Sequence, residues 1–212
     1  MRYLRPLWWW FYLLLLLLSC KQVDYRNSIC QVWTFKRYRF RNTVICAKQG
    51  TGFLIAEDTV LTCAHVVSFG SPSFLHRLLA DSVVCIFNSD TVCATICSTD
   101  YELDLTWLAL KEPRHRPLQV AKANLTPTTA ERFGSYLLVR GYPNAEWRCF
   151  PIRVIEPDTI KGKIVAMMDN HKSLGGASGS PIFYNHYVIG ILQEQGRGGY
   201  THKRFIRFRL LK

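Results

Sequence analysis

The chain has few acidic residues, no Cys-x-x-Cys pair and almost no repetition. Its 212 residues include 15 Asp and Glu against 27 Lys and Arg, which gives a formal net charge of +12. No two of the eight cysteines form a Cys-x-x-Cys pair, which argues against a structural zinc site, and we expect neither a metal ion nor a cofactor. Internal repeats and low-complexity segments are absent apart from one leucine run, so the length fits a single domain.

The positive charge restricts the classes of partner. It is compatible with nucleic acid, an anionic membrane surface or acidic substrates. The basic residues are dispersed, with two clusters at 36–41 and 203–209 in which basic and aromatic residues alternate. Such alternation predicts strands with one charged face. An anionic membrane surface fits the hydrophobic N-terminus better than nucleic acid does, so we expect no nucleic-acid partner.

The N-terminus carries a targeting signal. Arg2 and Arg5 precede an apolar run at 7–18, which suits a signal-peptide core of ~7–15 residues and is short of the ~20 that a membrane span needs. Cys20 follows Leu-Leu-Ser, as in a bacterial lipobox whose cysteine is lipidated after cleavage. We expect residues 1–20 to be a signal peptide or a lipoprotein-type membrane leader and 21–27 a short linker. An ordinary secretory cleavage and an uncleaved anchor remain open, and each implies an exported protein of the cell envelope, membrane-tethered or secreted.

The rest of the chain is rich in short apolar stretches that alternate in polarity. Many short strands with turn residues between them predict a barrel or sandwich. The expected strands are 29–35, 51–55, 82–87, 91–97, 136–140, 148–155, 164–168, 188–192 and 205–208. A short helix is expected within 66–80, and the proline-containing stretch at 111–130 predicts a connection.

Ser178 lies in the most informative stretch, Gly-Gly-Ala-Ser-Gly-Ser-Pro at 175–181. A serine that attacks a carbonyl needs small neighbours and a backbone N–H directed at the oxyanion that forms. Taken alone, the stretch is also typical of a tight turn. His65 ends an apolar β-branched run, and Asp104 precedes the apolar run at 105–110. Together the three residues predict a nucleophile, its base and an orienting carboxylate.

These motifs resemble those of a known family. The segments 60–67, 104–110 and 176–181 are similar to the histidine, aspartate and nucleophile motifs of chymotrypsin-like (trypsin-like) serine peptidases. The closest match is the HtrA-like and glutamyl-endopeptidase-like branch, here without a PDZ domain. The order His, Asp, Ser is that of chymotrypsin.

The resemblance implies an all-β fold of two six-stranded antiparallel barrels, with the active site in the cleft between them. The peptidase domain would span residues 28–212. Its expected parts are barrel 1 at about 28–111, a connection at about 112–130 and barrel 2 at about 131–212.

The resemblance also implies a serine endopeptidase that cleaves protein or peptide substrates through an acyl-enzyme. Ser178 would be the nucleophile, His65 the general base and then acid, and Asp104 the orienting carboxylate. The oxyanion hole would be the backbone N–H groups of Gly176 and Ser178. Residues Gln193, Glu194 and Gln195 follow the late strand, where family members pair with the substrate backbone. Solvated side chains at a strand end are an equal alternative for these three.

Two positions depart from the family pattern. Ala177 replaces the aspartate that trypsin-like digestive enzymes use in activation, and no Ile-Val-Gly-Gly start is present, so a trypsin-type activation is not expected. Leu192 stands where glutamyl-specific relatives have a histidine, so specificity for glutamate is not supported. Lys172 lies where specificity residues often occur and could favour acidic P1 side chains, although an exposed loop lysine is the simpler interpretation.

Two questions stay open at this point. If Cys20 is lipidated or removed, seven cysteines remain, which cannot all pair, and several lie in apolar strands where free cysteine acts as a small hydrophobe. The alternative function is a catalytically silent peptidase-fold protein that binds through its basic surface. A nucleic-acid-binding barrel is weaker still, and the sequence specifies no oligomeric state.

Overall fold

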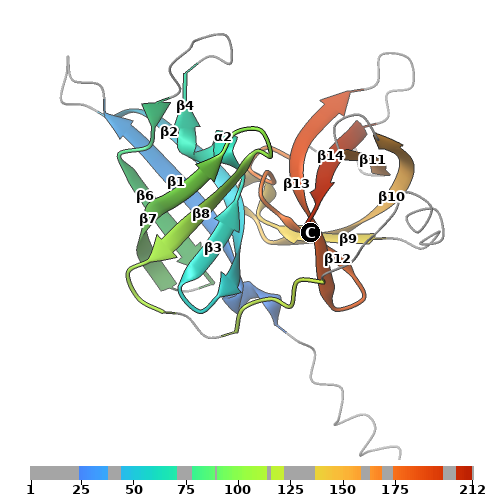
Figure 1. The fold of residues 1–212 in the computed structure, drawn as a ribbon, viewed down its shortest axis with the longest axis horizontal. Helices are drawn as coiled ribbons and strands as arrows, with labels where there is room; N and C mark the ends of the chain where they lie inside the picture. Colours follow the sequence, from blue (N-terminus) through green and yellow to red (C-terminus); the bar gives the residue numbers. More distant parts are fainter. Residues whose placement is uncertain are drawn as a thin grey trace, which may run out of the picture.

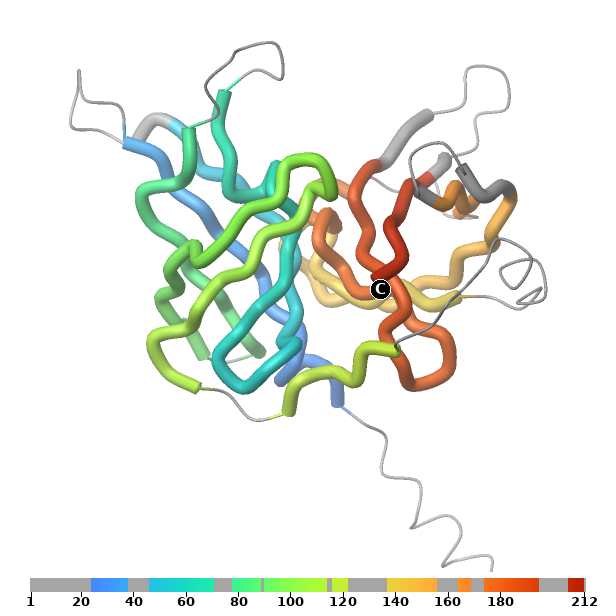
Figure 2. The backbone as a smooth tube through the Cα atoms, viewed as in Figure 1, coloured from blue at the N-terminus to red at the C-terminus, as the bar shows by residue number. Residues whose placement is uncertain are grey.

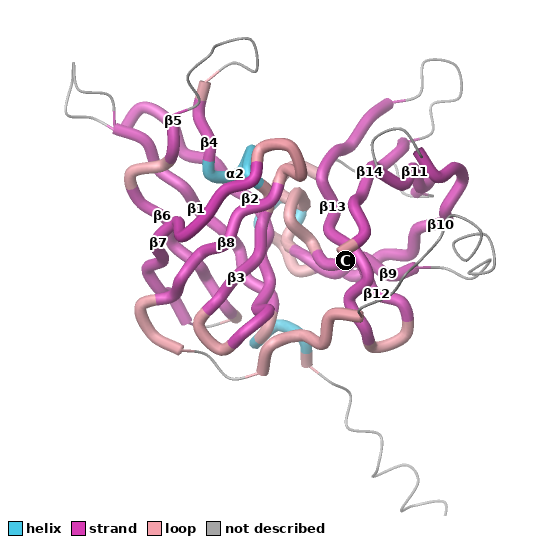
Figure 3. The backbone as a smooth tube through the Cα atoms, in the orientation of Figure 1, coloured by secondary structure: helices cyan, strands magenta, loops and turns pink. Residues whose placement is uncertain are grey.

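The computed structural model describes residues 24–37, 44–70, 78–88, 90–113, 116–121, 137–158, 163–168, 174–197 and 204–211. In these residues the chain forms two closed barrels of six strands each, which stand side by side (Figure 1). All strand pairs within the barrels are antiparallel. The expected all-β, two-barrel architecture is therefore confirmed. Figure 3 shows strand along most of the described backbone and only short helical segments.

The first barrel has the strand order β1-β2-β3-β8-β7-β6. Alternation produces these strands: in β6, Val83, Cys85 and Phe87 are buried, and the residues between them are not. A two-stranded sheet of β4 and β5 lies beside the barrel. The bounds are η1 (Tyr25–Asn27), β1 (Ile29–Arg37), β2 (Val44–Ala56), β3 (Thr59–Thr62), α2 (Ala64–Val67), β4 (Ser68–Phe69), β5 (Leu78–Leu79), β6 (Ser82–Phe87), β7 (Asp90–Asp100) and β8 (Leu105–Leu110).

The second barrel has the order β10-β11-β14-β13-β12-β9. Its inward side chains form a separate apolar cluster that includes Val139, Ile182 and Phe208. The bounds are β9 (Leu137–Gly141), η2 (Pro143–Ala145), β10 (Arg148–Asp158), β11 (Lys163–Met168), β12 (Pro181–Tyr184), β13 (Tyr187–Arg197) and β14 (Arg204–Leu210).

The two barrels pack directly on each other. Tyr142, Phe183, Val188 and Ile191 of the second barrel belong to the apolar cluster of the first. This shared cluster fixes the barrels relative to each other, and with them the residues that lie where the barrels meet.

Two further segments join the barrels. Figure 2 shows the connection around residues 116–121 running from the first barrel toward the second. There the N–H of Leu118 donates to the carbonyl of Leu54 (2.8 Å), and Val120 forms a bridge with Val188. Before β1, Tyr25 of η1 packs edge-on against Phe183 (5.0 Å between ring centres). The guanidinium of Arg140 lies 3.9 Å from the Tyr25 ring. Both segments thus cross from one barrel to the other.

Two sequence predictions of secondary structure were wrong. In the described part of 66–80 the expected helix is limited to the end of α2, which begins at Ala64 and has four residues, and β4 follows it at once. Residues 71–77 lie outside the described residues. Val66 and Val67 are buried against the first barrel, and β-branched residues favour extended backbone after such a turn. Residues 193–195 do not follow the late strand but belong to it, because β14 pairs with β13 as far as Arg197.

The expected leader at 1–20, with Cys20, lies outside the described residues. In the part of the chain that is described, no helix is long and apolar enough to cross a membrane. The seven cysteines in that part are all free thiols, among them Cys30 and Cys85 in the interior of the first barrel. Burial raises the pKa of the Cys30 thiol well above its usual range.

Candidate active site

Strand pairing brings His65 and Asp104 together. The end of β3 pairs with the start of β8, with Thr62 opposite Thr106. His65 follows the end of β3 by three positions, and Asp104 immediately precedes β8, so the two residues meet at one edge of the first barrel. The backbone N–H of His65 donates to Oδ1 of Asp104 (3.0 Å), and Nδ1 of its imidazole lies 2.8 Å from Oδ2.

The protonation pattern follows from this contact. A neutral imidazole that donates from Nδ1 to the Asp104 carboxylate keeps Nε2 as an acceptor. The Asp104 side chain is 19% exposed and the His65 side chain 44%. The carboxylate is thus largely enclosed, while the imidazole presents an edge to the cleft. Asp104 has a φ of +55°, which aspartate tolerates better than most residues.

Lys48 supports the backbone around His65. Its ammonium donates to the carbonyl of His65 (3.2 Å) and to that of Ser68, and it lies 5.0 Å from the centre of the Phe69 ring. Burial lowers the pKa of Lys48. These bonds satisfy the carbonyls of His65 and Ser68 at the C-terminal end of α2, because no further helical turn follows to supply backbone donors.

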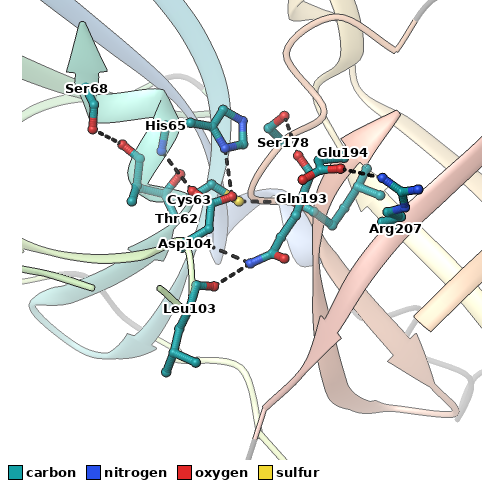
Figure 4. Close-up of polar contacts among 12 residues, drawn as sticks. Thr62, Cys63, His65, Ser68, Leu103, Asp104, Ser178, Gln193, Glu194 and Arg207 are labelled. Atoms are coloured by element: carbon teal, nitrogen blue, oxygen red, sulfur yellow. Dashed lines mark hydrogen bonds and ion pairs between the residues drawn. The ribbon is translucent and has the colours of Figure 1, made fainter. Parts of the chain in front are cut away.

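Ser178 lies in the loop at 174–180, which the second barrel contributes. Two tight turns shape this loop: the N–H of Ala177 donates to the carbonyl of Leu174 (2.9 Å), and that of Ser180 to the carbonyl of Ala177 (2.9 Å). Oγ of Ser178 donates to the carbonyl of Gln193 (3.2 Å). Figure 4 shows the His65 imidazole turned toward Ser178 across the cleft. Among the described residues no hydrogen bond joins Oγ to the imidazole.

Gly179 allows the loop to approach the first barrel. It has a φ of +91°, and a Cβ there would lie 1.9 Å from the carbonyl oxygen of Thr51. Its N–H donates to the carbonyl of Leu192 (2.7 Å). A side chain would therefore collide with backbone on one side while a strand holds the loop on the other.

We expect Gly179→Ala to lower the free energy of unfolding by about 3 kcal/mol, because both the positive φ and the collision penalise a side chain. Urea denaturation followed by tryptophan fluorescence measures this change. Ala145→Gly is the matched control, since Ala145 also has a positive φ (+62°) but is exposed. It should change stability by less than about 1 kcal/mol. Equal effects of the two variants would contradict the role assigned to Gly179.

The backbone N–H groups of Gly176 and Ser178 are unengaged within the described part of the chain. The N–H groups of Ala177, Gly179 and Ser180 all donate to nearby carbonyls, but these two do not. Gly176 has a φ of +80°. The loop therefore presents two backbone donors near Oγ of Ser178.

The four residues proposed to touch substrate have different surroundings. Lys172 lies outside the described residues, and so does the side chain of Gln195. Gln193 is buried (1% exposed), and its Nε2 donates to the carbonyl of Leu103 (2.6 Å) across the cleft (Figure 4). Glu194 is exposed and forms an ion pair with Arg207 (3.2 Å). The Gln193 side chain thus connects the barrels rather than facing solvent.

The edge of β13 beyond Leu192 is open on one side. β12 pairs with β13 only as far as Ile191, and the N–H of Leu192 donates to the carbonyl of Ser180. From Glu194 onward, β14 is the partner of β13 among the described strands. The opposite edge of residues 193–197 therefore lies beside Ser178 without a strand against it.

One group of side chains has the composition of a metal site. Ligand atoms of Cys63, His65 and Asp104 lie within 4.8 Å of one another. Each of them is already engaged: the thiol of Cys63 donates to the carbonyl of Leu192 (3.3 Å), and the other two bind each other. Cys63 is also fully buried. The arrangement is that of a hydrogen-bonded His–Asp pair packed on a thiol.

Three features of the site were not predicted from the sequence. They are the side-chain bridge of Gln193, the Lys48 contacts below α2 and the hydrogen bonds that Thr51 makes to the Ser178 loop. No local pattern marks them, because each depends on residues brought together from both barrels or from separate strands. The Thr-Gly pair in a strand that contains two glycines was the one available signal of a close backbone approach.

Comparisons with known proteins agree with this architecture. The chain is similar to the Rv3671c protease from M. tuberculosis in its active form (23% identity, TM-score 0.63), covering 87% of this chain and 76% of that one. It is also similar to the serine protease of a human pathogenic astrovirus (15% identity, TM-score 0.57), covering 88% of this chain and 91% of that one. At these identities the likeness concerns the fold. No curated protein sequence matches the chain.

A family model agrees with the structural likeness. The model described as a trypsin-like peptidase domain matches residues 50–191, which is more than half of the chain and includes His65, Asp104 and Ser178. The narrower HtrA-like and glutamyl-endopeptidase-like branch stays a prediction. The chain belongs to the trypsin-like peptidase family.

Proposed function

We propose that the protein is a serine endopeptidase in which Ser178, His65 and Asp104 act as a catalytic triad. The observation that supports this most strongly is the pair of hydrogen bonds from His65 to Asp104. They orient the imidazole with Nε2 as an acceptor, on the side where Ser178 and two unengaged backbone donors lie.

The reaction would begin with a rotation of the Ser178 side chain. Oγ now donates to the carbonyl of Gln193, and a change of χ1 would direct it at Nε2 of His65. Hydrogen bonds of this kind are often incomplete before substrate binds. Oγ would then attack the scissile carbonyl while Nε2 takes its proton.

The tetrahedral intermediate would place its oxyanion at the N–H groups of Gly176 and Ser178. Each such donor is typically worth ~3 kcal/mol of transition-state stabilisation. His65 would return the proton to the leaving amine, which leaves an ester on Ser178. Water, deprotonated by the same imidazole, would hydrolyse this ester and restore the hydroxyl.

The open edge of β13 would hold the substrate chain. Beyond Ile191 no described strand pairs with β13 on the side of β12, so this edge can accept an extended peptide as an additional strand, with the scissile bond beside Ser178. Glu194 and Arg207 form an ion pair on this side of the cleft. Backbone pairing of this kind suits a protein or peptide substrate and an endopeptidase.

A serine-directed fluorophosphonate probe tests the proposal. Folded wild-type protein should acquire one label, and peptide mapping by mass spectrometry should locate it on Ser178. Heat-denatured protein should not react, and His65→Ala should slow the reaction about 100-fold or more, because the base is lost. A folded wild-type protein that does not react, or that carries the label elsewhere, would favour a catalytically silent peptidase-fold protein instead.

Gln193 makes a second prediction. Gln193→Leu keeps the volume of the side chain but leaves the carbonyl of Leu103, in the turn that carries Asp104, without its donor. We expect kcat per titrated active site to fall about 10-fold, since this turn sets the position of the carboxylate. Gln119→Leu, on the exposed connection, is the control. An unchanged kcat would mean that the bridge only stabilises the fold.

A further inference from the structure

Thr51 is a fully buried residue of β2, and three of its hydrogen bonds cross to the second barrel. Its N–H donates to the carbonyl of Ser178 (2.8 Å). Its hydroxyl donates to the carbonyl of Gly176 (2.9 Å) and accepts from the N–H of Tyr142 (3.1 Å). One side chain of the first barrel therefore contacts two separate turns of the second barrel.

These contacts belong to a set of four hydrogen bonds that hold the backbone carbonyls of the Ser178 loop. The successive carbonyls of residues 175, 176, 177 and 178 each accept one hydrogen bond. The donors are, in order, the N–H of Asn144 (2.6 Å), the hydroxyl of Thr51 (2.9 Å), the N–H of Ser180 (2.9 Å) and the N–H of Thr51 (2.8 Å). Thr51 supplies two of the four donors. Its hydroxyl also holds the turn that supplies a third, because Tyr142 and Asn144 belong to the same turn.

Two of these carbonyls, those of Gly175 and Ala177, decide where the two free amides point, and Thr51 binds the other two and so holds the neighbouring peptides. In a trans peptide the C=O and N–H groups point in opposite directions. The carbonyl of Gly175 faces Asn144, so the N–H of Gly176 points away from that turn, and the carbonyl of Ala177 sets the N–H of Ser178 in the same way. With glycine at 175 and 176, little else in the backbone resists a rotation of these peptides.

The side chain that precedes the nucleophile, that of Ala177, cannot form a hydrogen bond to hold the loop. Ala177 is 1% exposed and lies in the apolar cluster of the second barrel. The hydrogen bonds to the carbonyls of residues 175, 176 and 178 come instead from β2 and from the turn at 142–145. The orientation of the loop is thus set by contacts between the barrels and needs no charged group beside the nucleophile.

We propose that the Thr51 hydroxyl is a positioning residue that keeps the backbone donors of Gly176 and Ser178 directed at the oxyanion. The inference rests on the proposed function of these two amides. A side chain of the first barrel would thus hold the Ser178 loop, which belongs to the second barrel. This also means that the site is set once the barrels have packed.

Thr51→Val tests this, because valine has nearly the same shape and neither donates nor accepts. We expect the acylation rate constant with p-nitrophenyl acetate, per titrated active site, to fall about 10- to 100-fold, less than the loss of a complete oxyanion donor. The apparent dissociation constant should stay within about 2-fold, since the amides act on the transition state. Thr51→Ser keeps the hydroxyl and should restore most of the rate.

The matched control is Ser28→Ala, which removes another buried hydroxyl that donates to a backbone carbonyl, that of Arg116 (2.7 Å). It should leave the acylation rate unchanged. If Thr51→Val does not fold, Thr51→Ala removes the same hydroxyl and is judged by the same rate constant. A wild-type acylation rate in a folded variant without the hydroxyl overturns the inference.

Amide proton and nitrogen NMR shifts separate this inference from the proposed function, because they need no catalysis. Thr51→Val should shift the resonances of Gly176 and Ser178, whereas Thr51→Ser and Ser28→Ala should not. If wild-type protein is inactive but these shifts occur, the proposed function fails and the positioning role stands. Unshifted resonances overturn the positioning role, whatever the activity.

Discussion

Ser178→Ala is expected to lower kcat about a millionfold while leaving the protein folded. Oγ is the only atom in the proposed mechanism that bonds to the substrate carbon, and losses of this size follow removal of a serine nucleophile. The hydrogen bond from Oγ to the carbonyl of Gln193 contributes little to stability. Steady-state hydrolysis of peptides selected from a library measures the loss, and circular dichroism checks the fold.

Ser180→Ala is the matched control for this change. Ser180 lies two residues further on and is fully buried, and its hydroxyl has no hydrogen-bond partner among the described groups. Alanine there should keep near wild-type activity, because no hydrogen bond of the side chain is lost. If Ser178→Ala keeps more than a small fraction of the activity, or if Ser180→Ala loses as much, the nucleophile has been assigned to the wrong serine.

Asp104→Asn should lower kcat about 10⁴-fold with little change in KM. The asparagine amide can donate to Nδ1 of His65, which would place the proton of the neutral imidazole on Nε2. Nε2 could then no longer accept the proton of Ser178, and the loss matches what the wrong tautomer costs such a triad. The kcat per titrated active site, measured near neutral pH, is the relevant quantity.

Asp100→Asn controls for a carboxylate lost from the same turn. Oδ1 of Asp100 accepts from the N–H of Leu103 (2.8 Å), and the oxygen of an asparagine amide can accept that bond equally well. We expect kcat within about 3-fold of wild type. A comparable loss in both variants would show that Asp104 acts by shaping the turn, and the orienting role would have to be abandoned.

The fold was predictable because local alternation and long-range pairing agree along most of the chain. Residues 82–87 alternate cleanly and form β6 with the expected bounds. The segment after His65 did not follow the local signal, since burial of Val66 and Val67 against the barrel limits the helix to four residues. The length of β13 could not be read locally either, because its last residues are strand through their pairing with β14.

The site was predictable where the chemistry requires a particular residue type, and less so where it depends on geometry. His65, Asp104 and Ser178 are recognisable because few other residues can act as base, orienting acid and nucleophile. Thr51 and Gln193 have ordinary sequence contexts, and their hydrogen bonds join residues separated by 125 and 90 positions. Such contacts exist only after both barrels have formed, and no window of sequence contains both partners.

The contact of Tyr25 with the second barrel has a consequence for synthesis. Tyr25 is made early, but the residues it packs on, Arg140 and Phe183, are made more than a hundred positions later. Because the chain is synthesised from its N-terminus, it can complete the strands of the first barrel while Tyr25 still lacks these partners. The segment around Tyr25 therefore reaches its final position only when the second barrel is present. Its docking marks the moment at which both halves of the cleft are in place.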